Sequence, residues 1–407
     1  MSASVGIVGG GVLGAALLHL LTDRHPDHSF TLFEKESGPG LHQTSHNSGV
    51  VHAGLYYAPG SLKSMLTRRG VELIRGFTLQ HGLPYEECGK LLIATEPSQV
   101  PQLERIAETA IANGVPGIRI LRTRHEIRAI EPHAVGIAAL HSPTTAITDY
   151  LAITRKLLEI AEGRGAHVHF DSEVTAITET PQDALVEVDG TLHRFDRVIT
   201  CTGLQSDLTA EMTGGSRFPV IVPFAGTYYT LNPTKGALVR GLIYPVPDPA
   251  YPFLGIHLTR MIDGSVTVGP DAFLAFKREG YSQRSFSVRD TRRILTTWAF
   301  WRFALQNAGA ALEQVRNGSR RMFAKQSSRF VPGIEASDLL PGPRGVRAQA
   351  MRHDGTLEED FVIESDGRIT HVRNAPSPAA TSSMAIAEHI ADLIDLGAPA
   401  DPASQAR

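Results

Sequence analysis

The chain has 407 residues, of which 42% are hydrophobic and 20% charged, and its formal net charge is −3 at pH 7. This composition excludes a disordered, fibrous or multi-spanning membrane protein, and the charge provides no general attraction to nucleic acid. The length exceeds what one simple core needs and predicts two closely packed domains.

Cysteine content and the start of the chain predict where the protein works. Only Cys88 and Cys201 occur. This pair offers neither a disulfide framework nor the spacing of a metal site, so we expect no metal and a reducing compartment. A strand begins by Val5, which leaves no room for a leader peptide, and no run of 18 apolar residues predicts a membrane span. We therefore expect a cytoplasmic protein.

In chain order, the first elements predict a strand–helix–strand unit over residues 5–8, 12–21 and 30–33. Helices are expected next at 62–80 and 102–113, and Asp149 is the expected N-cap of a helix that ends near Gly165. The remaining patterns predict strands at 166–178, 184–195 and 198–201, a strand-rich part at 218–269, a helical part at 287–315, a strand at 369–372, a helix at 377–396 and a flexible tail at 398–407.

The turn after the first strand carries a dinucleotide-binding pattern made of Gly9, Gly11 and Gly14. The first glycine allows the turn, the second lets a pyrophosphate approach the backbone, and the third packs the helix on the strand. Glu34 ends the second strand twenty residues after Gly14, where it would accept hydrogen bonds from a ribose. An acid at this position disfavours NADP, whereas FAD and NAD both remain open.

Three further segments resemble flavoproteins of the D-amino-acid oxidase superfamily: residues 43–54, 198–203 and 374–381. The last segment precedes the final helix, whose N-terminus would stabilise the anionic reduced flavin. The resemblance implies FAD as cofactor and implies an α/β fold, with a Rossmann-like FAD-binding domain and a mixed-sheet α+β substrate domain. Beside the glycines and Glu34, it implies contacts to FAD from Thr44, Ser45, Asn47, Ser48, Val174, Gly203, Asn374, Ser377, Ala379 and Thr381.

Longer motifs are similar to the L-2-hydroxyglutarate oxidase/dehydrogenase family, and together they span almost the whole chain: residues 46–63, 88–94, 253–259, 263–270, 274–281, 345–350 and 372–383. This resemblance implies oxidation of L-2-hydroxyglutarate to 2-oxoglutarate by transfer of the C2 hydride to flavin N5. A quinone or oxygen would then take the electrons. An amine or amino-acid oxidase on the same fold, and an oxidase of another 2-hydroxy acid, remain alternatives.

One position pair departs from that family, which usually has an arginine and an acid on either side of Gly226. Here these positions hold Ala225 and Thr227, on one face of a predicted strand. Either an ion pair is missing as a unit, with little consequence, or the substrate pocket has lost a cation and changed.

Oxidising an α-hydroxy acid requires a carboxylate clamp, a base and a hydride acceptor, and the resemblance suggests residues for each. Arg347 is the expected clamp, since a guanidinium matches a planar carboxylate. His257 is the expected base, with His52 beside the flavin and a covalent link there left open. Tyr244 is expected in the substrate pocket. A second substrate carboxylate would need a second cation, for which Lys277 is the first candidate, followed by Arg278 and Arg260.

The resemblance also predicts how the chain divides. An FAD-binding domain is expected from residues 1–80, 147–215 and 343–397, and a substrate-binding domain from 81–146 and 216–342.

The segment 284–329 has an unusual charge, with ten Lys or Arg against two acids, a net charge of +8. Helical spacing predicts one apolar stripe formed by Ile294, Trp298, Trp301, Leu305 and Leu312. An apolar stripe flanked by basic residues is typical of peripheral contact with an anionic membrane, here the inner face of the cell membrane, but also of packing against the substrate domain or another subunit.

Overall fold

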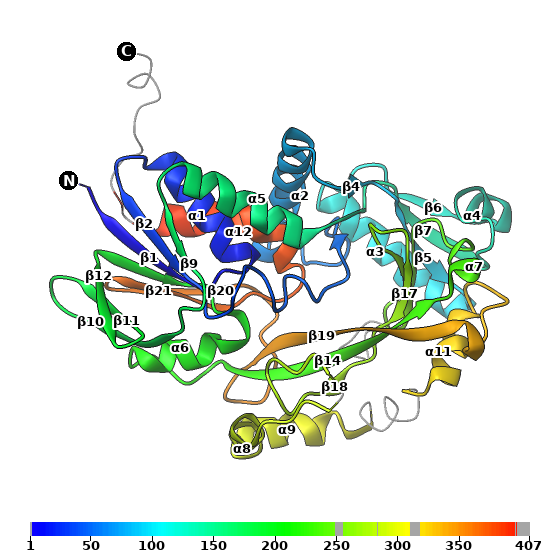
Figure 1. Ribbon diagram of the computed structural model, residues 1–407. Helices are drawn as coiled ribbons and strands as arrows, with labels where there is room; N and C mark the ends of the chain where they lie inside the picture. The colour runs from blue at the N-terminus through cyan, green and yellow to red at the C-terminus, as the bar shows by residue number, and fades with distance from the viewer. Residues whose placement is uncertain (1, 249–254, 283, 310–317, 395, 397–407) are drawn as a thin grey trace, which may run out of the picture.

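The structure is a computed structural model that describes residues 2–248, 255–282, 284–309, 318–394 and 396 (Figure 1). Two large sheets lie in different parts of the molecule, and helices α1, α5, α12 and α2 gather over one of them. No helix of the described residues is long and apolar enough to cross a membrane.

The first sheet has six strands, in the order β20-β21-β13-β1-β2-β9. All neighbouring pairs are parallel except β20–β21. Buried parallel strands read as short apolar runs, as residues 5–8 do. The strands are β1 (Ser4–Val8), β2 (Ser29–Phe33), β9 (His167–His169), β13 (Arg197–Thr200), β20 (Val362–Asp366) and β21 (Ile369–Asn374).

Alternation along β1 decides what covers each face of this sheet. Val5 and Ile7 pack against the helices α1 (Val12–Arg24), α2 (Leu62–His81), α5 (Tyr150–Gly163) and α12 (Ala379–Leu393). Val8 belongs to a separate core with the antiparallel sheet of β10 (Val174–Glu179), β11 (Ala184–Val188) and β12 (Thr191–Phe195).

The second large sheet has nine strands, in the order β18-β14-β17-β16-β15-β5-β7-β6, with β19 paired to β14. The antiparallel pair β14–β19 is long and passes below the first sheet in Figure 1. The strands are β5 (Lys90–Ala94), β6 (Arg119–Leu121), β7 (Ala138–Ser142), β14 (Val220–Leu231), β15 (Leu242–Pro245), β16 (His257–Arg260), β17 (Val266–Gly269), β18 (Phe273–Leu274) and β19 (Leu339–Met351).

A small sheet joins the two parts, with β8 (Ala146–Thr148) between β3 (Val50–Val51) and β4 (Tyr85–Glu86). The other helices are α3 (Val100–Ala112), α4 (Arg124–Ile130), α6 (Ser206–Met212), α7 (Pro233–Gly236), α8 (Val288–Leu295), α9 (Trp298–Gln306) and α11 (Arg320–Ser327). Short 3-10 turns cover Pro97–Gln99, Gly203–Gln205 and Ala336–Asp338.

Several local predictions are confirmed. Asp149 caps α5 by accepting from the backbone N–H groups of Leu151 and Ala152. The turn between β11 and β12 has positive φ at both Asp189 (49°) and Gly190 (75°), as an Asp-Gly hairpin requires. The strand expected over 166–178 is instead two strands in different sheets, β9 and β10.

The single stripe predicted across 287–315 is wrong. The helix breaks between α8 and α9, at Thr296 and Thr297, so Ile294 is buried whereas Trp298, Trp301 and Leu305 are exposed. The inward side of α9 is formed by Ala299 and Phe300. Leu312 and the predicted tail at 398–407 lie outside the described residues.

Candidate active site

A cavity of about 470 Å³ opens where the glycine turn after β1 meets α6, β21 and the start of α12. Its walls include most of the residues expected to hold the cofactor: Gly9, Gly11, Glu34, Thr44, Val174, Gly203, Asn374 and Ala379. These residues come from sequence positions up to 370 apart, so the cavity exists only in the folded chain.

The glycines of the turn are required by contact and by backbone conformation. Gly9 has φ of 108°, and a Cβ there would lie 2.5 Å from the carbonyl oxygen of Cys201. A Cβ on Gly14 would lie 2.0 Å from the Gly9 carbonyl oxygen, because α1 starts directly against the turn. A Cβ at Gly11 would meet only the Thr44 hydroxyl, at 3.4 Å, so this glycine leaves backbone open to the cavity.

Glu34 and Thr44 hold this turn in shape. The Glu34 carboxylate accepts from the backbone N–H of Gly10 at 2.6 Å and of Glu36 at 2.9 Å. The Thr44 hydroxyl accepts from the Val12 N–H at 3.0 Å, at the N-terminus of α1. The turn, the acid and the exposed helix N-terminus fit the ADP half of a dinucleotide.

Other residues of the 43–54 loop act on the loop itself. Asn47 donates from Nδ2 to the carbonyls of Gln43 and Thr44, and its Oδ1 accepts from the Gly49 N–H. Ser45 is exposed and Ser48 is partly buried, and neither lines the cavity described above.

The C-terminal loop brings the start of α12 to the same cavity. Asn374 donates to the carbonyls of Glu358 and Asp360, Ser377 is exposed, and Ala379 lines the cavity. The Thr381 hydroxyl accepts from the His52 N–H at 3.1 Å and lies 3.0 Å from the Tyr150 hydroxyl. The helix that faces the cavity is thereby tied to the loop carrying His52.

His52 and His257 are close enough to share the same charged neighbours. Burial lowers the pKa of His52 to about 3, and the charges of Lys90, His257, Arg347 and Lys63 contribute. Burial also lowers the pKa of His257 to about 3, opposed by a hydrogen bond with the Gly255 carbonyl and reinforced by Lys90 and Arg347. Both imidazoles are therefore neutral at pH 7.

The hydrogen bond of His257 decides which ring nitrogen is available for chemistry. Nδ1 lies 2.9 Å from the carbonyl oxygen of Gly255, and a carbonyl can only accept. Nδ1 therefore carries the proton and Nε2 has the free lone pair that a base needs. The ring stacks on Tyr244, with centroids 3.8 Å apart and planes at 18°.

Arg347 lies on β19, directly opposite Phe224 of β14. Its charge acts on both histidines and on Tyr244, and its side chain hydrogen-bonds to Tyr228. The structure thus brings Arg347, His257, His52 and Tyr244 into one group, and their roles in the reaction stay predictions.

Lys90 joins this group and was missed in the sequence. It is the first residue of β5 and is only 2% exposed. Its ammonium lies 3.8 Å from the centroid of the Tyr244 ring and 5.1 Å from that of Tyr56. A lysine opening the apolar run Lys90–Ala94, inside a motif already recognised, was the only available signal.

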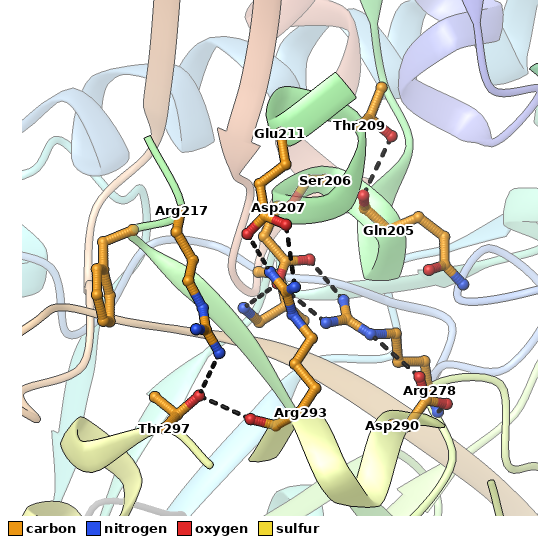
Figure 2. A network of polar contacts seen from close by, with 12 residues as sticks. Gln205, Ser206, Asp207, Thr209, Glu211, Arg217, Arg278, Asp290, Arg293 and Thr297 are labelled. Atoms are coloured by element: carbon orange, nitrogen blue, oxygen red, sulfur yellow. Dashed lines mark hydrogen bonds and ion pairs between the residues drawn. The ribbon is translucent and has the colours of Figure 1, made fainter. Parts of the chain in front are cut away.

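The three cations predicted for a second carboxylate do not belong to this group. Lys277 is exposed, and Arg260 pairs with Glu86 at 3.0 Å. Arg278 is buried in a network around Asp207 of α6, with contacts of 2.6 and 2.9 Å (Figure 2). Two of these residues already bind acids and the third faces solvent, so the structure gives no support to their assignment as substrate cations.

The departure at Ala225 and Thr227 lies on a different face from Arg347. The register pairs Ala225 with Val346 and Phe224 with Arg347, so neighbouring side chains point to opposite sides of the strand. Ala225 packs in an apolar cluster with Leu204 and Ile221. This placement favours an ion pair missing as a unit over a lost substrate clamp.

Comparison with known proteins agrees with the cavity and the fold. The family model of FAD dependent oxidoreductases matches residues 4–393. The chain is 41% identical over 411 residues to the human mitochondrial L-2-hydroxyglutarate dehydrogenase, covering 97% of this chain and 89% of that protein. It is 40% identical over 390 residues to the L-2-hydroxyglutarate dehydrogenase of Escherichia coli K12, covering 95% and 92%.

Solved structures show the same fold at low identity. The L-α-glycerophosphate oxidase of Mycoplasma pneumoniae, solved with FAD bound, has a TM-score of 0.80 at 21% identity and covers 99% of this chain and 97% of its own. Glycine oxidase of Geobacillus kaustophilus has a TM-score of 0.71 at 18% identity, covering 99% and 98%. The chain belongs to the FAD-dependent oxidoreductases, and within them to the L-2-hydroxyglutarate dehydrogenase family. FAD is its cofactor.

Proposed function

We propose that this protein oxidises L-2-hydroxyglutarate to 2-oxoglutarate. The observation that carries the proposal is a buried group of two basic side chains, Arg347 and Lys90, near two neutral histidines. Such a group suits an anionic substrate whose hydroxyl must lose a proton. The relatives named above carry the same activity in their names.

Each residue has a distinct part in this proposal. Arg347 binds the carboxylate next to the hydroxyl and fixes the C2 carbon, because its fork of donors matches a planar carboxylate. Nε2 of His257 accepts the hydroxyl proton, and Tyr244 holds the imidazole ring by stacking. His52 packs beside the flavin. Bound FAD supplies the two-electron acceptor for the hydride that leaves C2.

The proposal also divides the chain into two domains. We assign residues 1–80, 147–215 and 343–397 to the FAD-binding domain, and 81–146 and 216–342 to the substrate-binding domain. The six strands of the first sheet all fall in the former assignment, whereas His257 and Lys90 fall in the latter.

Anaerobic reduction of the holoenzyme tests the function. L-2-Hydroxyglutarate should bleach the flavin absorbance with formation of one 2-oxoglutarate per flavin, whereas its D enantiomer, L-lactate, glycine and L-glutamate should not. Bleaching by glycine or L-glutamate instead would reassign the protein to the amino-acid oxidases of this fold.

We also propose that the enzyme docks on an anionic membrane and passes its electrons to a quinone there rather than to oxygen. α9, which follows α8 in the chain, exposes Trp298, Trp301 and Leu305, with exposed fractions of 73%, 46% and 75%. The exposed arginines Arg289 and Arg302 belong to the same two helices. Aromatic residues beside basic ones are typical of an interfacial contact.

Flotation with liposomes tests this docking. Wild type should float with anionic but not neutral liposomes at low salt, and Trp298→Ala/Trp301→Ala should stay in solution. A matched variant at another exposed apolar site, Leu192→Ala on β12, should float as wild type does. Absence of wild-type binding to both liposome types would remove the membrane from the proposal.

A further inference from the structure

Lys90 is a buried cation whose charge no described acid balances. Among the described residues its side chain has no hydrogen bond and no ion pair with a carboxylate, and it is 2% exposed. Its ammonium instead makes cation–π contacts with the rings of Tyr244 and Tyr56. A cation–π contact recovers only part of what an ammonium loses when it leaves water. Burial of the ammonium therefore costs folding free energy unless an anion binds beside it.

The register of the sheet places Lys90 close to the reacting group. Lys90 lies opposite Leu242 of β15, and β15 pairs in turn with β16, which begins at His257. Strands lie about 4.8 Å apart, so the backbones of β5 and β16 are separated by about 10 Å. The Tyr244 ring bridges this interval, since it stacks on His257 and lies under the Lys90 ammonium.

A second donor in the same place also has no partner. The Tyr56 hydroxyl is buried and has no hydrogen-bond partner among the described residues. Burial raises the pKa of Tyr56 well above its ordinary value, so the hydroxyl keeps its proton at neutral pH. The Lys90 ammonium lies 5.1 Å from the centroid of the Tyr56 ring. The lysine and this neighbouring tyrosine, whose hydroxyl has no described hydrogen-bond partner, together offer two donors to a carboxylate.

Resting on the function proposed above, we propose that Lys90, together with the Tyr56 hydroxyl, binds the distal carboxylate of the substrate and so makes the enzyme selective for dicarboxylic 2-hydroxy acids. Arg347 holds the carboxylate beside the hydroxyl, and Lys90 holds the one at the other end of the carbon chain. On the sheet these two cations lie on opposite sides of β16.

A competing role for Lys90 is that of the base. Burial lowers the pKa of Lys90 to about 7, so its neutral form is present at neutral pH. The two roles need opposite protonation states. A carboxylate clamp needs the ammonium, so dicarboxylate binding weakens as pH rises through about 7. A base needs the free amine, so turnover would instead increase over the same range.

Lys90→Met tests the proposal, because methionine keeps the length and apolar stem of lysine without its charge. The first readout is binding of glutarate, which has two carboxylates and no hydroxyl, and of pentanoate, which has one carboxylate. Perturbation of the flavin absorbance spectrum measures both without turnover. The variant should weaken glutarate binding about a hundredfold and pentanoate binding much less.

The second readout is the ratio of kcat/KM for L-2-hydroxyglutarate to that for L-2-hydroxypentanoate, which should fall about a hundredfold. Tyr56→Phe should lower the same ratio by about tenfold or less, as expected for one neutral donor. Lys277→Met removes an exposed lysine and should leave the ratio unchanged. Flavin content reports whether each variant is folded.

The outcomes separate this proposal from the one on which it rests. Failure of the wild type to oxidise L-2-hydroxyglutarate would end the proposed function, while the glutarate and pentanoate affinities would still decide the role of Lys90. Equal losses by Lys90→Met on both ligands, or on both substrates, would overturn the distal clamp. So would glutarate binding that does not weaken as pH rises through about 7.

Discussion

Asp207 joins α6 to the segment before α8, and its removal should be among the most destabilising single changes in the chain. Its side chain is fully buried and accepts from both Arg278 and Arg293 (Figure 2). Its Oδ2 also accepts from the backbone N–H of Ile221 at 3.1 Å. One carboxylate therefore balances two guanidinium groups and one strand N–H.

The magnitude follows from what Asp207→Ala leaves behind. Arg278 has a side-chain exposure of 3%, and the only other acid that pairs with it among the described residues, Asp290, lies 3.6 Å away. Breaking a buried pair by removing one partner costs about 3–5 kcal/mol. Arg293 adds little to this loss because it is 16% exposed and keeps Glu211. We expect a loss of about 4 kcal/mol, or about a thousandfold in the folding equilibrium.

Denaturant unfolding of the holoenzyme measures this loss. Glu211→Gln is the matched control, since its side chain is 32% exposed and its removal should cost less than about 1 kcal/mol. The double variant Asp207→Ala/Arg278→Met removes both charges and should recover part of the stability. A loss below about 1 kcal/mol for Asp207→Ala, or no recovery in the double variant, would refute the reasoning.

Three further predictions concern the site and its surroundings. Arg347→Ala should raise KM by roughly 30- to 1,000-fold, the equivalent of about 2–4 kcal/mol, with flavin content unchanged; kinetics like those of wild type would remove it from the site. His257→Gln should slow flavin reduction about a hundredfold or more, and such a loss in His52→Ala alone would reverse the two roles. Burial lowers the pKa of His371 to about 4. As pH falls, this imidazole is therefore protonated near pH 6.5 in the unfolded chain but only near pH 4 in the folded chain. Stability should therefore decrease as pH falls from about 6.5 to about 4, by at most about 1.4 kcal/mol per pH unit for this residue, and His371→Gln should reduce that slope in thermal unfolding.

Structural features that depend on residues close together in the sequence could be predicted from the sequence. The glycine turn and the Asp149 cap each depend on contacts within one junction, and Glu34 bonds to Gly10 within the same strand–helix–strand unit. The Asp189-Gly190 turn likewise determines its own hairpin. Such features need no knowledge of the remaining fold, and the structure contains all of them.

Features that depend on partners far along the chain were not readable. Arg278 looked like a candidate for a substrate carboxylate, but its partner Asp207 is 71 residues away. The stripe across 287–315 followed helical spacing through the break at Thr296 and Thr297. In both cases a local pattern was sound, and tertiary contacts decided which way the side chains face.

Lys90 illustrates the same limit at the site itself. Its proposed role depends on β15, which places the Tyr244 ring under the ammonium. Leu242 of β15, the residue paired with Lys90, is 152 residues further along the chain. In the proposed mechanism Arg347 on β19 and His257 on β16 act at C2, whereas the proposed clamp for the second carboxylate, Lys90, lies on β5, on the far side of β16. A cation on β5 therefore lies on a different strand from Arg347 and His257, and it reaches His257 only through its charge and the Tyr244 ring. Related oxidases that share this fold at about 20% identity have different substrates in their names, among them glycine and glycerophosphate. Changes on strands of the substrate sheet such as β5, with the flavin site kept, are one physical way for a single fold to serve such different substrates.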